Sequence, residues 1–344
     1  MAGARLTHWH LITCEFPPRF GGVSDYSSQL AAGLRAAGVD LRVWCDEFEG
    51  FTNAGLRRVG ALIDAMPKPR RLLVQWVPHG YGRRSMNVEF CRWVANRASK
   101  HGDEVDLMVH EPCLSFWEGG LVHNVIAGVH RVMLTLLLRR ASRVWMGSTA
   151  WGPYLRPYLF GRDIPLEWAP VPSNIPVAPH GADADYPVGY FGQYDEQGIR
   201  VLMQVLEAIP DRIALIGRGA DRVPMHERTI VIGESDAGRI SRAIASCWVM
   251  LHHYVDGVTT RRGTVMASLA HGKAVVTVEG RLSESVWRES GAVSLAPVGD
   301  SAALANNIRG LLREHDARAA LGKAGAKLYR ERFSLDHTIA QLLR

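Results

Sequence analysis

The chain has 344 residues, of which 47% are hydrophobic and 22% charged, and its formal net charge is +6. This composition is typical of a soluble globular protein, excludes disorder over most of the chain, and at this length favours two domains. The largely apolar stretches fall short of the ~20 residues that cross a bilayer, and the N-terminus resembles a strand more than a signal peptide. We therefore expect a cytoplasmic protein.

Five cysteines are scattered along the chain, and none forms a C-x-x-C pair. Their odd number and their spacing predict neither a disulfide framework nor a zinc site, so we expect small buried thiols. They are Cys14, Cys45, Cys91, Cys113 and Cys247.

Basic residues are concentrated in the first half of the chain, with 20 Lys and Arg against 15 Asp and Glu in residues 1–180 and 20 against 19 in the remainder. A local surplus between positions 57 and 84 faces only Asp64 and could meet phosphates on a ligand, a lipid headgroup or nucleic acid, although a solvated basic face is the commoner explanation. Nucleic acid is disfavoured because no aromatic residues interleave with the charge. The surplus consists of Arg57, Arg58, Lys68, Arg70, Arg71, Arg83 and Arg84.

In chain order, short β-branched runs alternate with stretches of helical period, which predicts parallel sheets covered on both faces by helices. In the first half we expect strands at 6–14, 41–44, 72–75, 107–109 and 143–147, and helices at 24–37, 88–100 and 125–140. In the second half we expect strands at 188–191, 212–216, 229–232, 249–252, 274–278 and 292–295, and helices at 198–208, 236–245, 264–271, 301–314, 317–333 and 335–343.

Prolines crowd residues 165–187 and interrupt the alternation, which suits a crossing between domains. We predict an α/β protein of two Rossmann-like, doubly wound domains facing a cleft. Their expected extents are 1–176 and 177–328, and residues 329–344 are expected to hold a closing helix that crosses back to the first domain. Because ligands of such sheets bind beyond the carboxyl ends of the strands, function is expected in the loops there.

Two loops of the first half follow predicted strands. Gly21 and Gly22 lead into a helix whose N-terminus favours an anion, although a helix entry capped by Ser24 would explain the same residues. His110, followed by Glu111 and a proline, comes after the strand at 107–109. A neutral imidazole there can hydrogen-bond a bound hydroxyl, although a lone histidine is commonly structural.

One loop of the second half, residues 254–264, gathers a carboxylate, two hydroxyls and two guanidiniums before a helix. Asp256 suits sugar hydroxyls, whereas Arg261, Arg262 and the helix amides suit a diphosphate. An exposed polar loop is the alternative interpretation. The segment beginning Gly217-Arg218-Gly219 lacks the third glycine of a dinucleotide fingerprint.

No metal site is predicted, because the D-x-D pattern at 183–185 lies in the proline-rich crossing. The chain also lacks the G-x-S-x-G, Walker and H-E-x-x-H motifs, which excludes the corresponding hydrolase, P-loop and zincin classes.

Taken together, these loops resemble the family-4-like (group 1) retaining glycosyltransferases of the GT-B fold, and the resemblance covers nearly the whole chain. The similar segments follow the family's order. They are Glu15–Pro18 with Gly21–Val23 and Gln29–Ala31, His110–Pro112, Val171–Pro176 with Asn174, Gly192 to Gly198, Ala270–Val276 and Tyr329–Leu343.

The sequence departs from the family's pattern at charged positions. The two glutamates of the family's E-x₇-E pattern correspond to Thr259 and Ala267, which leaves Asp256 as the acid available to replace the first. The family's donor-facing Arg and Lys correspond to Gln193 and Gln197. The cations available to replace them are Arg261, Arg262 and Arg218.

The resemblance implies an enzyme that moves a sugar from a nucleotide-diphosphate donor to an acceptor hydroxyl with retention. The nucleotide sugar is a co-substrate, and no metal or other cofactor is implied. His110 and Asp256 are the implied catalytic residues, each bonding sugar hydroxyls, and the leaving phosphate takes the acceptor proton. The implied donor-binding residues are Gly21, Gly22, Gly192, Gln193, Arg218, Thr259, Arg261, Arg262, Gly263 and Thr264.

Two other functions stay open: a non-catalytic sugar-nucleotide-binding protein, and an epimerase or hydrolase that would use Glu111 and Asp256 as a carboxylate pair. The expected acceptor is a small molecule, a glycan or a lipid-linked sugar. Arginines and leucines interleave in residues 130–145, which suggests that the first domain contacts an acidic acceptor or a membrane surface. Leucines at that spacing are also typical of a buried helix face.

Overall fold

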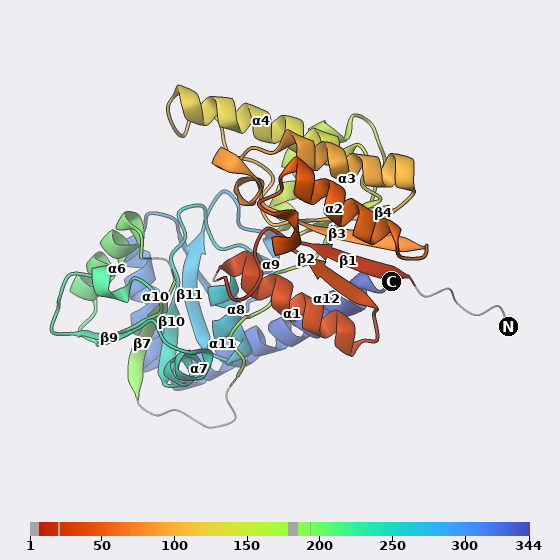
Figure 1. Cartoon of the computed structure of the whole chain (residues 1–344). Coiled ribbons are helices and arrows are strands. Elements are labelled where there is room, and N and C mark those ends of the chain that lie inside the picture. Colours follow the sequence, from red (N-terminus) through yellow and green to blue (C-terminus); the bar gives the residue numbers. More distant parts are fainter. Residues whose placement is uncertain (1–6, 20, 178–184, 193) are drawn as a thin grey trace. The chain divides into compact units, whose positions relative to one another are not determined.

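The computed structural model describes residues 7–19, 21–177, 185–192 and 194–344 (Figure 1). Its contacts divide the chain into two compact units, Met1–Pro170 with Ile339–Arg344, and Val171–Thr338. The division therefore precedes the expected boundary at 176. The last helix, α12 (Leu335–Leu342), starts in the second unit and ends in the first, where the Leu342 carbonyl accepts a hydrogen bond from Arg71 Nη1 at 3.2 Å.

The first unit contains a six-stranded, wholly parallel sheet in the order β2-β1-β3-β4-β5-β6. Its strands are β1 (His8–Ile12), β2 (Leu41–Trp44), β3 (Arg70–Trp76), β4 (Glu104–Val109), β5 (Arg143–Met146) and β6 (Leu166–Trp168). Its α-helices are α1 (Gly22–Ala36), α2 (Asn53–Asp64), α3 (Val88–His101), α4 (Leu121–Leu138) and α5 (Gly152–Leu155).

The second unit contains another six-stranded parallel sheet, in the order β12-β11-β10-β7-β8-β9. Its strands are β7 (Tyr186–Phe191), β8 (Ile213–Ile216), β9 (Thr229–Gly233), β10 (Cys247–Leu251), β11 (Ala274–Glu279) and β12 (Ser294–Pro297). Its α-helices are α6 (Glu196–Ala208), α7 (Ala237–Ala245), α8 (Gly263–Ala270), α9 (Ser285–Glu289), α10 (Ser301–Arg313) and α11 (His315–Leu328), followed by a π-helical turn at Tyr329–Phe333.

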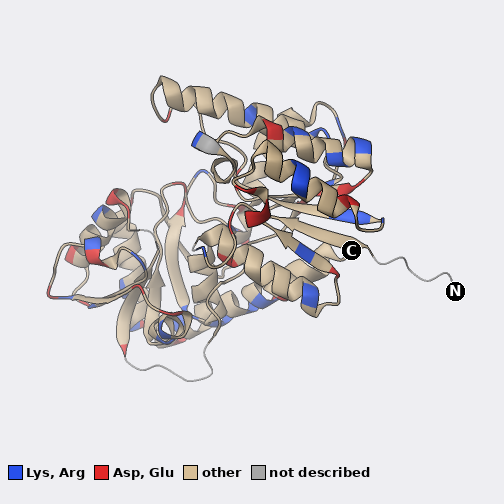
Figure 2. Cartoon of the chain, viewed as in Figure 1, with Lys and Arg blue, Asp and Glu red and all other residues tan. Residues whose placement is uncertain are grey.

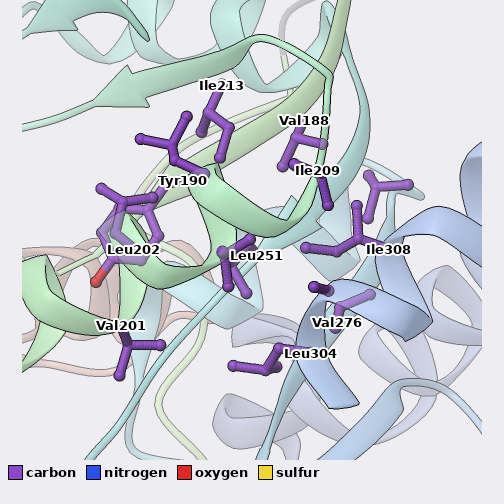
Figure 3. Packing of buried hydrophobic residues seen from close by; sticks show 14 of the residues in the cluster. Val188, Tyr190, Val201, Leu202, Ile209, Ile213, Leu251, Val276, Leu304 and Ile308 are labelled. Atoms are coloured by element: carbon purple, nitrogen blue, oxygen red, sulfur yellow. The ribbon is translucent and has the colours of Figure 1, made fainter. Parts of the chain in front are cut away.

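One hydrophobic cluster of the second unit lies between its sheet and the two helices α6 and α10 (Figure 3). Val188 of β7, Leu251 of β10 and Val276 of β11 are fully buried there. Leu202 of α6 and Ile308 of α10 pack against them. These apolar side chains recur at the spacings typical of helices and buried strands. The sequence therefore predicted the alternation of strands and helices that defines a doubly wound domain.

Several local expectations were wrong. The proline-rich stretch is not all linker, because Leu166–Trp168 pairs in parallel register with Val144–Met146 as the edge strand β6. Helix α1 begins at Gly22 and not at the expected cap Ser24, whose Oγ instead donates to the Arg19 carbonyl at 2.6 Å. Helix α2 was missed, although Thr52 caps it by accepting from the Gly55 amide.

Four cysteines are buried and Cys113 is partly buried, all of them as free thiols. Helix α4 starts at Leu121, earlier than expected, and by length and composition alone it is long and apolar enough to cross a membrane. The sequence interpretation missed this property because Arg131 interrupts the uncharged run. Only a third of the helix is buried inside the protein.

The basic surplus of residues 57–84 is partly used inside the first unit, so it does not form one ligand-facing surface. Arg70 Nε donates to Asp103 Oδ1 at 2.7 Å, and Arg97 Nε of α3 donates to the other oxygen of Asp103 at 2.6 Å. Arg71 Nε donates to Asp106 Oδ2 at 3.0 Å. These ion pairs are buried, so the arginines at the start of β3 are part of the folded core.

Asp103→Ala is expected to lower the free energy of unfolding by about 3–5 kcal/mol, because it leaves Arg70 and Arg97 buried without their shared carboxylate. Urea denaturation of the full chain measures the loss. The matched control is Arg58→Ala, which breaks an exposed pair with Glu49 and should cost less than about 1 kcal/mol. Equal losses in the two variants would contradict the assignment.

Candidate functional site

Each sheet has a point where the strand order reverses, which is where open α/β sheets bind ligands. In the first unit, β1 lies between β2 and β3, and in the second, β7 lies between β8 and β10. Gly21 and Gly22 follow β1, and Gly192 follows β7. The predicted glycines therefore lie at both reversal points.

Gly21 is the N-cap residue of α1, and no side chain caps this helix. The amides of its first turn have no partner within the helix and point toward the loop, where they can bind an anion. Thr13 Oγ1, just after β1, lies 3.0 Å from Ser27 Oγ, which fixes the end of the strand against the helix.

His110 directly follows β4 and is 9% exposed. Its Nε2 lies 2.8 Å from Gln75 Oε1, near the end of the adjacent strand β3, so the ring donates from Nε2 to the amide oxygen. The Tyr26 ring packs edge-on against the imidazole with centroids 4.9 Å apart. Gln75 thereby orients the ring. Sequence reasoning missed it, although a polar residue near the carboxyl end of an apolar strand was a usable signal.

The loop after β10 and the start of α8 bring five of the ten predicted donor-binding residues together. Arg262 occupies the N-cap position of α8, which starts at Gly263 and has no side-chain cap. The Arg262 guanidinium lies 4.9 Å from the centre of the Tyr254 ring. Thr264 Oγ1 lies 2.8 Å from Tyr254 Oη. Together with its neighbour Arg261, this arrangement gathers positive charge at a helix N-terminus.

Among the buried polar atoms in and near this loop, Thr259 Oγ1 and His253 Nε2 find no hydrogen-bond partner in the part of the chain that the structure describes. Burial lowers the pKa of His253, so its imidazole is neutral at pH 7. An unpaired buried polar atom costs about 1–3 kcal/mol, and a bound polar ligand would recover this cost. His253 was missed in the sequence analysis, although it follows a predicted strand.

Asp256 is held by a residue of the next loop. Its Oδ1 accepts a hydrogen bond from Arg281 Nε at 2.8 Å. The two backbones also touch, because a Cβ on Gly257, whose φ is +90°, would lie only 2.3 Å from the Gly280 nitrogen. The loop after β11 therefore fixes the carboxylate predicted to be catalytic.

Glu284, in the same loop after β11, is 6% exposed and holds the loop of residues 254–264 in place through hydrogen bonds; we call it the clamp. Its carboxylate accepts from the Thr260 amide at 3.1 Å, from Thr260 Oγ1 at 2.6 Å and from Trp287 Nε1 at 2.8 Å. Thr260 is next to Arg261, so Glu284 positions the cationic pair. The sequence offered no local signal for this contact.

The remaining predicted residues are not all brought together. Arg218 follows β8 and pairs with Glu234 at 2.7 Å, with both side chains exposed. Because β7 separates β8 from β10, Arg218 belongs to a different loop from Arg262. Gln193 lies outside the described residues, and so does Asp183 of the D-x-D pattern.

No protein-family model matches the sequence. A phosphatidyl-myo-inositol mannosyltransferase of Mycobacterium leprae is 25% identical, with 94% of this chain and 92% of the relative covered. The sucrose-phosphate synthase of Thermosynechococcus elongatus matches with a TM-score of 0.74 and 15% identity over 97% of both chains. HepE of Anabaena, solved with UDP and glucose, matches with a TM-score of 0.69 and 14% identity over 98% of both. These likenesses confirm the predicted GT-B architecture.

A buried chain of polar groups under the loop is expected to make the second unit sensitive to acid. His252 Nε2 lies 2.8 Å from Ser268 Oγ, and burial lowers the pKa of His252 from 6.5 to about 4. The unfolded chain therefore binds one more proton than the folded chain between these values. Stability should be full above pH 6.5 and should fall by up to about 3 kcal/mol toward pH 4. His252→Gln should flatten this dependence in urea titrations, whereas His315→Gln, at an exposed site, should not.

Glu284→Ala should lower the free energy of unfolding by about 2–4 kcal/mol, because it removes the acceptor of the Thr260 and Trp287 hydrogen bonds. Urea denaturation measures the change. The control is Glu289→Ala, at the exposed end of helix α9, which begins directly after Glu284, and it should change stability by less than about 0.5 kcal/mol. If the two variants unfold alike, the clamp does not exist.

Proposed function

We infer that this chain is a glycosyltransferase of the GT-B fold that moves a sugar from a nucleotide-diphosphate donor to an acceptor hydroxyl. The observation that carries the proposal is the loop after β10, where Arg261, Arg262 and the α8 N-terminus lie beside the buried, unpartnered hydroxyl of Thr259. Guanidiniums and helix amides suit a diphosphate, and an unpaired buried hydroxyl suits a polar ligand. The coverage of nearly the whole chain by the mycobacterial mannosyltransferase supports the same class.

The second unit is proposed to bind the donor. Arg262 and the first amides of α8 would stabilise the charge that grows on the leaving diphosphate, which is a common and large contribution to catalysis. Thr259 and the neutral His253 would hydrogen-bond ligand hydroxyls. UDP and glucose are bound by HepE, and transfer of mannose is named for the mycobacterial relative. For this chain we propose only the class of the donor, which is a nucleoside diphosphate hexose.

Within the first unit, His110 and the amides at Gly21 and Gly22 are proposed to bind substrate groups. Because His110 Nε2 donates to Gln75, the ring is oriented rather than mobile, and the residue can present a fixed hydrogen-bonding edge to a sugar hydroxyl. The amides at the start of α1 would meet an anionic part of a substrate.

Retention is proposed to proceed without a protein nucleophile. Arg281 donates a hydrogen bond to the carboxylate of Asp256. A carboxylate held in this way can still accept hydrogen bonds from sugar hydroxyls, but it is a poorer nucleophile toward the anomeric carbon. The acceptor oxygen would form its bond to the anomeric carbon on the face from which the phosphate departs. The bond from carbon to the phosphate oxygen breaks, and that oxygen takes the acceptor proton. No metal is required in this scheme.

A second candidate, sugar-nucleotide binding without transfer, is favoured by one observation. Ala267, in the place of a family glutamate, is fully buried on α8 and supplies no polar group. Turnover separates the two functions. Incubation with a panel of nucleotide sugars and phosphorylated or lipid-linked acceptors should release the nucleoside diphosphate and yield a glycosylated product, whereas a binder would release neither.

The acceptor is proposed to be phosphorylated or lipid-linked, with the protein in the cytoplasm and the first unit in peripheral contact with the membrane that carries the acceptor. The basic residues that stay exposed in the first unit support this proposal, among them Arg139 and Arg140.

Replacing Arg261 and Arg262 together by Ala should weaken binding of UDP or GDP by at least about a hundredfold, because each charge-assisted hydrogen bond is worth roughly 1.5–3 kcal/mol and two are lost. Calorimetric titration measures the affinity, and urea denaturation confirms that the variant folds. The control Arg309→Ala/Arg313→Ala removes two arginines from α10. An unchanged affinity in the Arg261/Arg262 variant would refute the placement of the donor.

A further inference from the structure

Helix α4 packs into the first unit by one face only. Its buried residues recur at helical spacing, so they lie on one side of the helix. His130 on that side is tied to the fold, because its Nε2 lies 2.7 Å from the Ser85 carbonyl oxygen. The buried residues are Ala127, His130, Met133, Leu134, Leu137 and Leu138.

The opposite face of α4 exposes large apolar side chains to solvent. Leu121 is 81% exposed, Val122 74%, Val125 57% and Val132 54%. At 100° per residue these positions fall within one stripe about 100° wide. Trp117, in the loop just before the helix, is 85% exposed. A contiguous exposed apolar surface of this kind marks an interaction site.

The same stripe ends in positive charge. Arg139 and Arg140 follow α4, are exposed, and continue the direction of Leu121 and Val122 around the helix. They line a groove between α3 and α4 together with Arg92, which pairs with Glu89 at 2.5 Å. No Asp or Glu occurs in the whole of α4, and Figure 2 accordingly draws the helix without red segments.

We propose that this outward face of α4, with Trp117 before it and the groove arginines after it, docks on the surface of an anionic bilayer. The apolar first turns and Trp117 would enter the boundary between headgroups and acyl chains, and the arginines would contact lipid phosphates. Charge complementarity favours this occupant, because α4 contains no acidic residue and its exposed stripe continues into Arg139 and Arg140. Glu118 beside Trp117 and Glu89, which pairs with Arg92, are the acidic residues next to this surface. The helix lies on the membrane and does not cross it, since its other face is part of the core of the unit.

The proposal deepens the proposed function, on which it rests for the lipid-linked acceptor. It also narrows the sequence-based expectation, which placed the contact in the interleaved arginines and apolar residues of 130–145 and in the basic surplus of residues 57–84. Of the first segment, Val132, Arg139 and Arg140 are exposed and belong to the docking surface. Leu134, Leu137 and Leu138 are buried in the unit, and Arg70 and Arg71 are in internal ion pairs. The docking surface is the other side of the same helix.

The test is co-sedimentation of the full chain with vesicles of phosphatidylcholine alone or mixed with phosphatidylglycerol, at low and high salt. The wild type should bind the anionic vesicles more tightly, and less so at high salt. Leu121→Ser/Val125→Ser should weaken that binding at least tenfold. Arg139→Gln/Arg140→Gln should remove the preference for anionic lipid. The control Leu62→Ser/Val231→Ser, which changes exposed apolar residues elsewhere, should bind like the wild type.

Failure of the wild type to sediment with anionic vesicles at low salt would overturn the proposal. So would a concentration-dependent dimer, seen by analytical ultracentrifugation without lipid, that Leu121→Ser/Val125→Ser dissolves, because the face would then bind a second copy. UDP and GDP titrations of the same variants without vesicles keep the two proposals apart. Nucleotide affinity should be unchanged when docking is lost, and vesicle binding should be unchanged in the Arg261/Arg262 variant.

Discussion

Parallel pairing is the constraint on which the rest of the structure depends. In a wholly parallel sheet every strand delivers its carboxyl end to the same edge, so residues far apart in sequence meet there without any further device. In the first unit this edge carries Gly21 after β1 and His110 after β4, with Gln75 at the end of β3. In the second it carries the cationic loop after β10 and the clamp after β11.

The periodicity of the sequence was sufficient for most elements because the apolar positions that fill the core are also the ones that define the strand and helix patterns. The strand at 41–44 has the predicted bounds. Elements were missed where the pattern was too short or interrupted. Strand β6 has three residues inside a proline-rich stretch, and α2 contains two glycines that weaken a helical prediction. The structure of such segments depends on tertiary contacts, which for β6 are its pairing with β5.

Predicting the site was possible to the extent that a single loop carried it. The composition of residues 254–264 pointed to a place for a diphosphate, and the structure puts that loop at the strand-order reversal of the second sheet. The partner of this loop was not predicted, because nothing local in the sequence links Glu284 to Thr260. In the first unit, the position of Gln75 near the end of β3 was a usable signal, but its hydrogen bond with His110 was not predicted. The same limit explains the basic surplus of residues 57–84, since the pairing of Arg71 with Asp106 exists only once β3 and β4 are neighbours.

The departures from the family pattern become coherent when the loop after β10 is considered with its supports. The family's pattern has donor-facing Arg and Lys in the loop after the first strand of the second domain, where this chain has Gln193 and Gln197. In this chain the cations Arg261 and Arg262 lie in the loop after β10 instead. A pair of adjacent guanidiniums binds an anion better where the backbone that carries it is already fixed, because the loop then loses little conformational entropy on binding. Glu284 holds that backbone through Thr260. If the loop binds the donor as proposed, its position, which is set by the buried carboxylate of Glu284 in the neighbouring strand connection, is what the affinity for that donor would depend on.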